Sequence, residues 1–165
     1  MPSTCYIALG SNLGNRGENL HRALAAIAQL ATTRVVRISQ FITTTPVGGP
    51  AGQENYLNAA AQLTTELSPE DLLKSLLAIE RDIGRDRARA IRNGPRNIDL
   101  DILLYDNLLM DNPELKIPHP HMHERLFVLR PLAEIAATVI HPRLEKTVMA
   151  LLRTCPMGSC DSAQS

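Results

Sequence analysis

The chain has 165 residues, 44% of them hydrophobic and 21% charged, and its 17 lysines and arginines balance 17 aspartates and glutamates. This length and composition predict a single folded domain and exclude an intrinsically disordered chain. A net charge of zero excludes a general electrostatic attraction to nucleic acids or anionic membranes.

The first quarter of the chain predicts a strand, a helix and a second strand. Residues 5–9 form a short apolar run that ends at Gly10, which is typical of a buried strand. Asn15 or Asn19 can cap the following helix. Residues 34–43 are rich in β-branched side chains, as in a strand. The helix has apolar residues at helical spacing, namely Leu20, Leu24, Ile27 and Leu30.

The next segments predict a loop, a strand and a helix. Three glycines and two prolines between 44 and 53 exclude regular structure there. Residues 56–65 are typical of a strand. Ser68 is a typical helix cap because Pro69 and two acidic residues follow it. An apolar stripe continues this helix to Gly84, which ends it.

The remaining segments complete an α+β domain. The order β-α-β-β-α-β is the ferredoxin-like pattern, and its second and third strands follow each other without a helix, so we expect an antiparallel sheet with helices packed on it. The domain is expected to span residues 1–154, with residues 155–165 as a frayed tail. The second half of the chain predicts a loop at 85–95, a strand at 98–105 and a hairpin at 107–117. A rigid loop at 118–124 and two short helices, at 131–138 and 144–152, follow.

Neither a membrane span nor a signal peptide is predicted. No stretch approaches the roughly 18 apolar residues of a span, and the first residues lack the basic and apolar regions of a signal peptide. The three cysteines, Cys5, Cys155 and Cys160, form no disulfide framework or zinc site by their spacing. These features predict a cytoplasmic protein.

The most informative segment is a strand that carries two aspartates. Because side chains alternate along a strand, Asp99 and Asp101 point to one face while Ile98, Leu100 and Ile102 point to the core. Two carboxylates about 7 Å apart can flank a divalent cation. Mg²⁺ is favoured because water and substrate phosphates complete its coordination. A solvated, charged sheet face is the alternative explanation.

Charge is distributed unevenly around this pair. Residues 85–96 contain five arginines and one aspartate, a net charge of +4, whereas residues 99–114 contain five acidic residues and no basic one, a net charge of −5. Arginines beside metal-binding carboxylates are the arrangement that phosphoryl transfer requires. The two segments together predict a site for a small polyanion.

Three histidines and a glycine-rich turn are the next segments with a possible binding pattern. His119, His121 and His123 alternate like zinc ligands, but neighbouring prolines exclude an ordinary strand, so a phosphate or ribose contact is favoured over zinc. The glycine-rich turn at 10–15 lacks the spacing of a phosphate-binding loop.

A third group offers aromatic rings. Tyr56 and Asn58 share a strand face and present a ring and a carboxamide to a flat heterocycle, and Phe127 could supply a second ring. Ordinary packing of both rings is the alternative.

Five segments together carry a family resemblance, at residues 8–14, 56–59, 92–102, 117–120 and 125–132. The most specific is the Gly-Pro-Arg-x-x-Asp-Leu-Asp string that ends at Asp101. The likeness runs collinearly from about Tyr6 to Leu152. By these motifs the chain resembles the 6-hydroxymethyl-7,8-dihydropterin pyrophosphokinase family of folate biosynthesis.

The resemblance implies transfer of an intact pyrophosphoryl group from ATP to the pterin hydroxymethyl group, with release of AMP and with two Mg²⁺ ions. Asp99 and Asp101 match the metal-binding carboxylates, and they are expected to be catalytic together with Arg85 and Arg96. The positions that match ATP contacts are Arg85, Arg87, Arg92, Arg96, Ile102, His119 and Arg125. The positions that match pterin contacts are Thr44, Pro46, Val47, Gly48, Tyr56, Asn58 and Phe127.

The expected partners are these small molecules alone, with no nucleic acid and no membrane, and a monomer is expected. Two positions depart from the family, because Asn93 stands where members often carry Trp and Pro120 where some carry Tyr. Two other functions stay open. One is a metal-dependent nucleotide phosphohydrolase, in which water replaces the pterin alcohol. The other is a ferredoxin-like RNA-binding module, which requires aromatic side chains on the central strands.

Overall fold

The structure, a computed structural model, describes residues 2–44, 55–84, 97–156 and 163–164. None of the helices in these ranges is long and apolar enough to cross a membrane. The elements in chain order are β1 (Ser3–Ser11), α1 (Arg16–Ala28), β2 (Thr33–Ile38), β3 (Ile42–Thr44), β4 (Tyr56–Thr65), α2 (Pro69–Ile83), β5 (Asp99–Tyr105), β6 (Met110–Asp111), β7 (Lys116–Ile117), the 3₁₀ turn η2 (Met122–Glu124), α3 (Leu126–Ala136), β8 (Ile140–His141), β9 (Lys146–Thr147), α4 (Val148–Thr154) and β10 (Ala163–Gln164).

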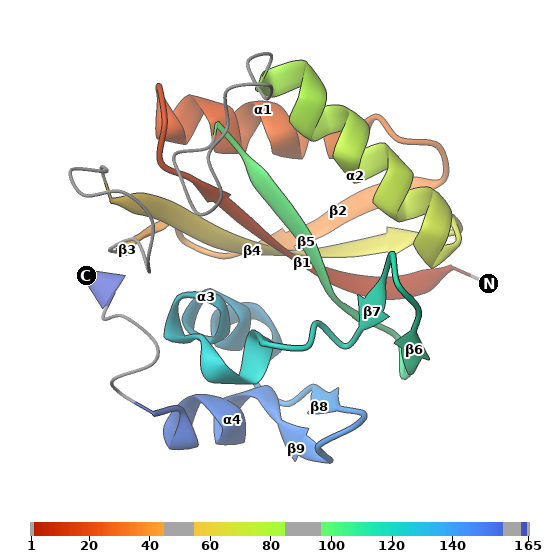
Figure 1. Ribbon diagram of the computed structural model, residues 1–165, viewed down its shortest axis with the longest axis vertical. Coiled ribbons are helices and arrows are strands. Elements are labelled where there is room, and N and C mark those ends of the chain that lie inside the picture. The colour runs from red at the N-terminus through yellow and green to blue at the C-terminus, as the bar shows by residue number, and fades with distance from the viewer. Residues whose placement is uncertain (1, 45–54, 85–96, 157–162, 165) are drawn as a thin grey trace.

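An antiparallel sheet lies between two layers of helices. Its strand order is β10-β3-β4-β1-β5, and β2 also pairs with β4. Figure 1 shows α1 and α2 on one face of the sheet and α3 and α4 on the other. Every strand pair is antiparallel, which confirms the predicted α+β class and antiparallel sheet.

Side-chain caps fix the starts of the first two helices. The Asn15 side chain accepts a hydrogen bond from the Glu18 backbone N–H at 3.0 Å, and Ser68 accepts one from Asp71 at 3.1 Å. Each such cap contributes about 1 kcal/mol to stability. Asn19 was the alternative cap for α1, but it is buried and donates to the Leu13 carbonyl instead.

The single strand expected at 34–43 is wrong, because the structure has two strands, β2 and β3, separated by Ser39–Phe41. The Ser39 hydroxyl accepts the backbone N–H of Ala60 at 2.8 Å, and the next N–H, of Gln40, donates to Glu134 on α3 at 2.9 Å. The Ser39 N–H still donates to the Ala60 carbonyl at 2.9 Å, so these two side-chain contacts replace the backbone acceptors only for Ala60 and Gln40. Both β2 and β3 therefore pair with β4, on successive stretches of it.

The helix expected near residue 131 begins five residues earlier, at Leu126. Pro131 lies inside α3 and is buried there. A proline inside a helix removes one backbone hydrogen bond, so the sequence alone favours a helix that begins at Pro131. The correction matters for function because it places Phe127 in the first turn of α3.

Each face of the sheet has its own hydrophobic core. Cys5, Ile7 and Leu9 of β1 belong to the core beneath α1 and α2, whereas Tyr6 belongs to the core beneath α3 and α4, and Ala8 packs against it. This alternation follows from the two-residue period of a strand. Because of this alternation, the side chains of the central strands point either toward α1 and α2 or toward α3 and α4. The candidate site lies on the side that faces α3.

His141 is a buried histidine that secures the β8–β9 hairpin. It is 3% exposed, and its Nδ1 accepts the backbone N–H groups of Arg143 at 3.3 Å and Leu144 at 3.1 Å. Burial first, and then the nearby His123 and Arg143, lower the pKa of His141, against its own backbone hydrogen bond, which raises it.

We expect stability to fall in mild acid because of this residue. The pKa of His141 is lower in the folded than in the unfolded protein, so the unfolded state binds the proton more tightly. The loss therefore begins as the pH falls below about 6.5, the ordinary histidine value, and ends below the folded-state pKa. Urea denaturation at about pH 7.5 and about pH 5.5 measures it, and His141→Asn should reduce the difference. An unchanged difference in that variant would contradict the assignment.

Candidate active site

Side chains from three neighbouring strands lie in rows across the α3-facing side of the sheet. Gly10 of β1 pairs with Asn58 of β4 on one side and with Asp99 of β5 on the other. In the next row on the same face, Ala8 pairs with Asp101. Because neighbouring strands are about 4.8 Å apart, the backbones of Asn58 and Asp99 lie about 10 Å apart, with β1 between them.

The two aspartates leave the core, as predicted. Leu100 and Ile102 are each 3% exposed and pack beneath α1 and α2, whereas Asp101 is exposed and Asp99 half-buried on the opposite face. The alternation that predicted this arrangement is therefore confirmed for residues 99–102. The acidic pair and Asn58 share one face, with only the small residues of β1 between them.

Gly10 forms the floor between the two groups. A Cβ atom at this position would lie 3.0 Å from Asn58 Nδ2 and 3.5 Å from Tyr56 Cδ1. The first distance is tighter than most Cβ contacts, so any larger residue at this position requires the Asn58 amide to shift by a few tenths of an ångström. The ring of Tyr56 and the amide of Asn58 therefore lie directly over β1.

The amide of Asn58 is held in one orientation. Thr44, which is 1% exposed, donates its hydroxyl hydrogen to Asn58 Oδ1 at 2.5 Å. Since the oxygen is bound on that side, the Nδ2 donor points toward Gly10 and the face of the sheet. Thr44 pairs with Tyr56 across β3 and β4, so Thr44, Tyr56 and Asn58 form one connected group.

A β-bulge in β5 places His119 beside the aspartates. Tyr6 pairs with Leu104 but Ile7 pairs with Ile102, so Leu103 is an extra residue in β5. The Leu103 carbonyl accepts the backbone N–H of His119 at 3.0 Å. The loop that contains His119 is thereby attached to the strand that carries Asp101.

The ring of His119 is held as a hydrogen-bond donor. Its Nδ1 accepts the backbone N–H of His121 at 3.1 Å, so in the neutral ring the proton is on Nε2. Burial lowers the pKa of His119, Asp101 raises it, and Arg125 and His121 lower it further. All three charged or titratable neighbours therefore lie within electrostatic reach of the His119 ring.

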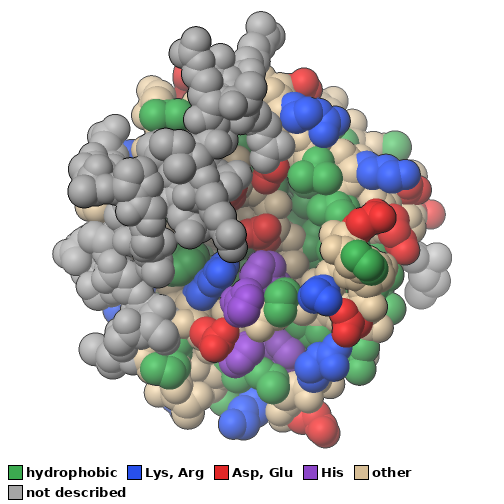
Figure 2. Space-filling view, in the orientation of Figure 1, with side chains coloured by type: hydrophobic (Ala, Val, Ile, Leu, Met, Phe, Trp, Pro, Cys, Tyr) green, Lys and Arg blue, Asp and Glu red, His purple; other side chains and the backbone are tan. Residues whose placement is uncertain are grey.

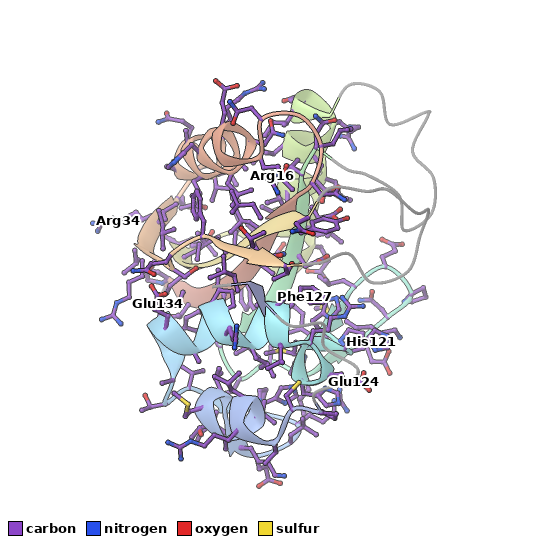
Figure 3. The ribbon with its side chains drawn as sticks, turned by 90° about the vertical axis from the view of Figure 1, so that its left-hand side faces the viewer. Arg16, Arg34, His121, Glu124, Phe127 and Glu134 are labelled. Atoms are coloured by element: carbon purple, nitrogen blue, oxygen red, sulfur yellow. The ribbon has the colours of Figure 1, made fainter. Side chains whose placement is uncertain are left out.

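The start of α3 brings a ring and a cation to the same place. The Arg125 guanidinium lies 5.7 Å from the centroid of the Phe127 ring, a distance at which a cation and an aromatic face attract. His121 Nδ1 and Glu124 Oε1 are 3.0 Å apart. Figure 3 shows Phe127 and the His121–Glu124 pair at one end of α3, with Glu134 at the other end.

The surface around these residues combines both signs of charge. Figure 2 shows acidic side chains next to a group of histidines near the middle of this face, with a basic side chain beside them. Within the described ranges, no group of three or more His, Cys, Asp or Glu side chains is arranged to hold a metal ion.

Part of the expected site falls outside the described residues. These positions are Pro46, Val47, Gly48, Arg85, Arg87, Arg92 and Arg96. Of the others, Ile102 needs a correction, because its side chain is buried beneath α1 and α2 and does not face a ligand. Any nucleotide contact of Ile102 must use its backbone.

Two positions next to the site are not singled out by the sequence. The sequence places Gly10 in a glycine-rich turn, and its position under Asn58 depends on strand register, which the sequence does not show. Glu80 of α2 is 6% exposed, and its carboxylate accepts the backbone N–H of Leu100 at 2.7 Å. The sequence marks Glu80 as unusual in one way, because it is an acidic residue within the apolar stripe, one turn after Leu76.

An acidic pair, a histidine donor and aromatic rings on one face of an α+β sheet are the groups that a nucleotide-dependent transferase requires. A model of the 7,8-dihydro-6-hydroxymethylpterin-pyrophosphokinase family matches residues 6–137, and the chain belongs to this family.

Named relatives agree with the family match. The chain is similar to the 2-amino-4-hydroxy-6-hydroxymethyldihydropteridine pyrophosphokinases of Haemophilus influenzae and Pseudomonas aeruginosa. The first is 51% identical over 139 residues, which is 84% of this chain and 85% of the relative. The second is 46% identical over 151 residues, which is 92% of this chain and 91% of the relative.

A solved structure shares the fold. The crystal structure of Plasmodium falciparum HPPK-DHPS, wild type with pterin and p-hydroxybenzoate, superposes with a TM-score of 0.70 at 13% identity. The match covers 93% of this chain and 43% of that longer one. At this identity the likeness shows the fold alone.

Proposed function

We propose that Asp99 and Asp101 are the metal-binding acids of this pyrophosphokinase, which transfers pyrophosphate from ATP to the hydroxymethyl group of 6-hydroxymethyl-7,8-dihydropterin in folate biosynthesis. The observation that carries the proposal is the register across β4, β1 and β5. It places the acidic pair and Asn58 on one face, with Gly10 between them. This spacing brings a nucleotide side and a pterin side next to each other.

The donor set fits Mg²⁺ that arrives with a nucleotide. Two aspartates at alternate positions of a strand are too few for an all-protein metal site, but Mg²⁺ is commonly held by one or two carboxylates together with substrate phosphates. We propose two such ions at Asp99 and Asp101. Bound there, Mg²⁺ neutralises phosphate charge and lowers the pKa of the acceptor hydroxyl.

The nucleotide side is formed by the loop and helix next to β5. The Nε2–H of His119 donates to a phosphate oxygen, and the Arg125 guanidinium supplies positive charge at the same end. Ile102 contributes backbone groups at the outer edge of β5. Sequence resemblance adds Arg85, Arg87, Arg92 and Arg96 as phosphate contacts, of which Arg85 and Arg96 are the catalytic pair.

The pterin side is formed by β3, β4 and the start of α3. Tyr56 and Phe127 stack on the two faces of the ring. The Asn58 amide, fixed by Thr44, donates to the edge of the ring. Backbone groups at Pro46, Val47 and Gly48 are proposed as further edge contacts.

The reaction needs alignment more than a protein nucleophile. The acceptor oxygen forms a bond to the β-phosphorus of ATP, the bond from that phosphorus to the α–β bridging oxygen breaks, and AMP leaves. The hydroxyl proton passes to a nearby base, for which Asp99 and Asp101 are the closest candidates on this face. Holding both substrates on one rigid sheet face provides the in-line geometry.

The products test the proposal directly. Incubation with ATP, Mg²⁺ and the hydroxymethyl-dihydropterin should give AMP and the pterin diphosphate in equal amounts, and neither without the pterin. A phosphohydrolase would instead release phosphate or pyrophosphate from ATP with no pterin present. ADP as the nucleotide product, or pterin-independent release, would contradict the proposal.

We also propose that residues 1–154 form the catalytic domain, that residues 155–165 form a tail of which Ala163 and Gln164 pair with β3, and that the enzyme acts as a cytoplasmic monomer without nucleic acid. What supports this is the balanced overall charge together with the local concentration of both signs near one small site. The sheet face at β5 presents carboxylates rather than aromatic rings, which does not favour RNA binding.

A further inference from the structure

Glu80 is a carboxylate in a place that suits a hydrophobic side chain. It lies one helical turn after Leu76 on the inner face of α2 and is 6% exposed, next to the core beneath α1 and α2. Burying a carboxylate is unfavourable unless hydrogen bonds stabilise it. A leucine would pack at this position without that penalty, so packing does not account for Glu80.

One contact of Glu80 is with the strand that carries the acidic pair. Glu80 Oε2 accepts the backbone N–H of Leu100, the residue between Asp99 and Asp101, at 2.7 Å. Asp99 and Asp101 pair with Gly10 and Ala8 on the side of β1. In an antiparallel pair the backbone groups of alternate residues point to opposite edges, so the Leu100 N–H points away from β1 and toward α2.

The strand is therefore fixed from both edges at the acidic pair. Gly84, at the end of α2, also lies close to Asn97, just before β5, because a Cβ atom built at Gly84 would be 3.4 Å from Asn97 Cβ. The end of α2 is therefore close to the start of β5. Neither contact touches the face on which the aspartates lie.

We infer that Glu80 is a positioning residue, which fixes the direction and spacing of the Asp99 and Asp101 carboxylates through the Leu100 backbone. This inference rests on the proposed metal role of the two aspartates. Residues that orient metal ligands from behind typically change metal affinity by about 10- to 100-fold when they are replaced. Glu80 acts in this way without contacting a substrate.

Three variants and one control test this role. Glu80→Leu removes the acceptor, Glu80→Asp keeps the charge but shortens the reach, and Glu80→Gln keeps an oxygen at the same distance. Leu76→Ala, one turn earlier on the same face of α2, weakens packing without touching the Leu100 N–H. The readouts are hydrogen exchange of the Leu100 amide in the metal-free protein and Mg²⁺ affinity, measured by calorimetry with a nonhydrolysable ATP analogue.

We expect Glu80→Leu and Glu80→Asp to speed exchange of the Leu100 amide at least about tenfold and to weaken Mg²⁺ affinity by about 10- to 100-fold. Glu80→Gln should stay within about threefold of the wild type in both, because its oxygen accepts the same N–H. Leu76→Ala should lower the melting temperature but leave Mg²⁺ affinity unchanged. Should Glu80→Leu not fold, the comparison of Glu80→Asp with Glu80→Gln decides the question.

Two results would overturn the inference while leaving the proposed function intact. One is wild-type Mg²⁺ affinity in Glu80→Leu or Glu80→Asp. The other is an equal loss in Glu80→Gln and Glu80→Leu, which would assign the effect to charge and not to position. If the wild-type protein bound no Mg²⁺ with the ATP analogue, the proposed metal role and the inference would both be wrong.

Discussion

Replacing Asp101 with alanine is expected to lower kcat at least about a thousandfold, a loss of about 4 kcal/mol in transition-state stabilisation. Asp101 is exposed on the α3-facing side of β5 and lies within electrostatic reach of His119. Without it, the proposed metal loses one of two protein ligands, and the phosphate charge is no longer neutralised in the aligned geometry. Asp99→Ala should have a similar effect. Steady-state rates at saturating Mg²⁺ and both substrates measure it.

Asp111→Ala is the matched control for these variants. Asp111 belongs to the same acidic segment, but it lies on β6 and pairs with Lys116 at 2.6 Å on the surface. Exposed pairs of this kind contribute between about 0 and 1 kcal/mol to stability, so kcat should be unchanged. Near-normal rates in Asp101→Ala at saturating Mg²⁺ would contradict the metal role.

The second large effect is expected from a single methyl group. Gly10→Ala places a Cβ atom 3.0 Å from Asn58 Nδ2. The amide cannot move aside easily, because Thr44 binds its oxygen from a buried position. We expect kcat/KM for the pterin to fall about tenfold, since the amide must shift by a few tenths of an ångström and a displacement of about 1 Å costs about 100-fold.

The specificity of this effect can be checked on the other substrate. The affinity for an ATP analogue should remain within about twofold in Gly10→Ala, because the new methyl group points toward Asn58 and Tyr56. Gly17→Ala is the control, since its Cβ would meet only Asn15 Oδ1 at 4.0 Å. That variant should keep full activity and gain about 0.5–1 kcal/mol of helix stability. Equal losses of affinity for the ATP analogue and for the pterin in Gly10→Ala would contradict the assignment of Gly10 to the pterin side.

Local signals in the sequence predicted the elements that frame the site. The cap at Ser68, the glycine at 84 and the alternation around Asp99 and Asp101 each depend on residues close together in the chain. Their physical causes act over one turn of helix or two residues of strand. For that reason the acidic pair could be assigned to one face before the fold was known.

Features that depend on distant residues could not be predicted in this way. The break at Ser39 requires Ala60 and Glu134, and the bulge at Leu103 is visible only in its pairing with β1. Gly10 under Asn58 depends on register between β1 and β4. The sequence contains these residues, but which of them are in contact is determined by tertiary packing.

Glu80 is another residue whose role could not be predicted from the sequence alone. A charge within an apolar stripe conflicts with the local pattern, and such conflicts occur where function outweighs packing. The pattern alone indicates that the position is unusual. The partner, the Leu100 backbone, becomes known only when α2 is packed against β5.

The central claim is that the divalent metal binds at Asp99 and Asp101, on the face shared with Asn58. Paramagnetic Mn²⁺, added in small amounts to the protein with a nonhydrolysable ATP analogue, tests it by broadening the amide signals nearest the bound ion. Asp99 and Asp101, together with Gly10 and Ala8 that pair with them, should lose their signals first. Sharp signals at Ala8 and Gly10, with broadening centred on His123 and His141 instead, would contradict the account.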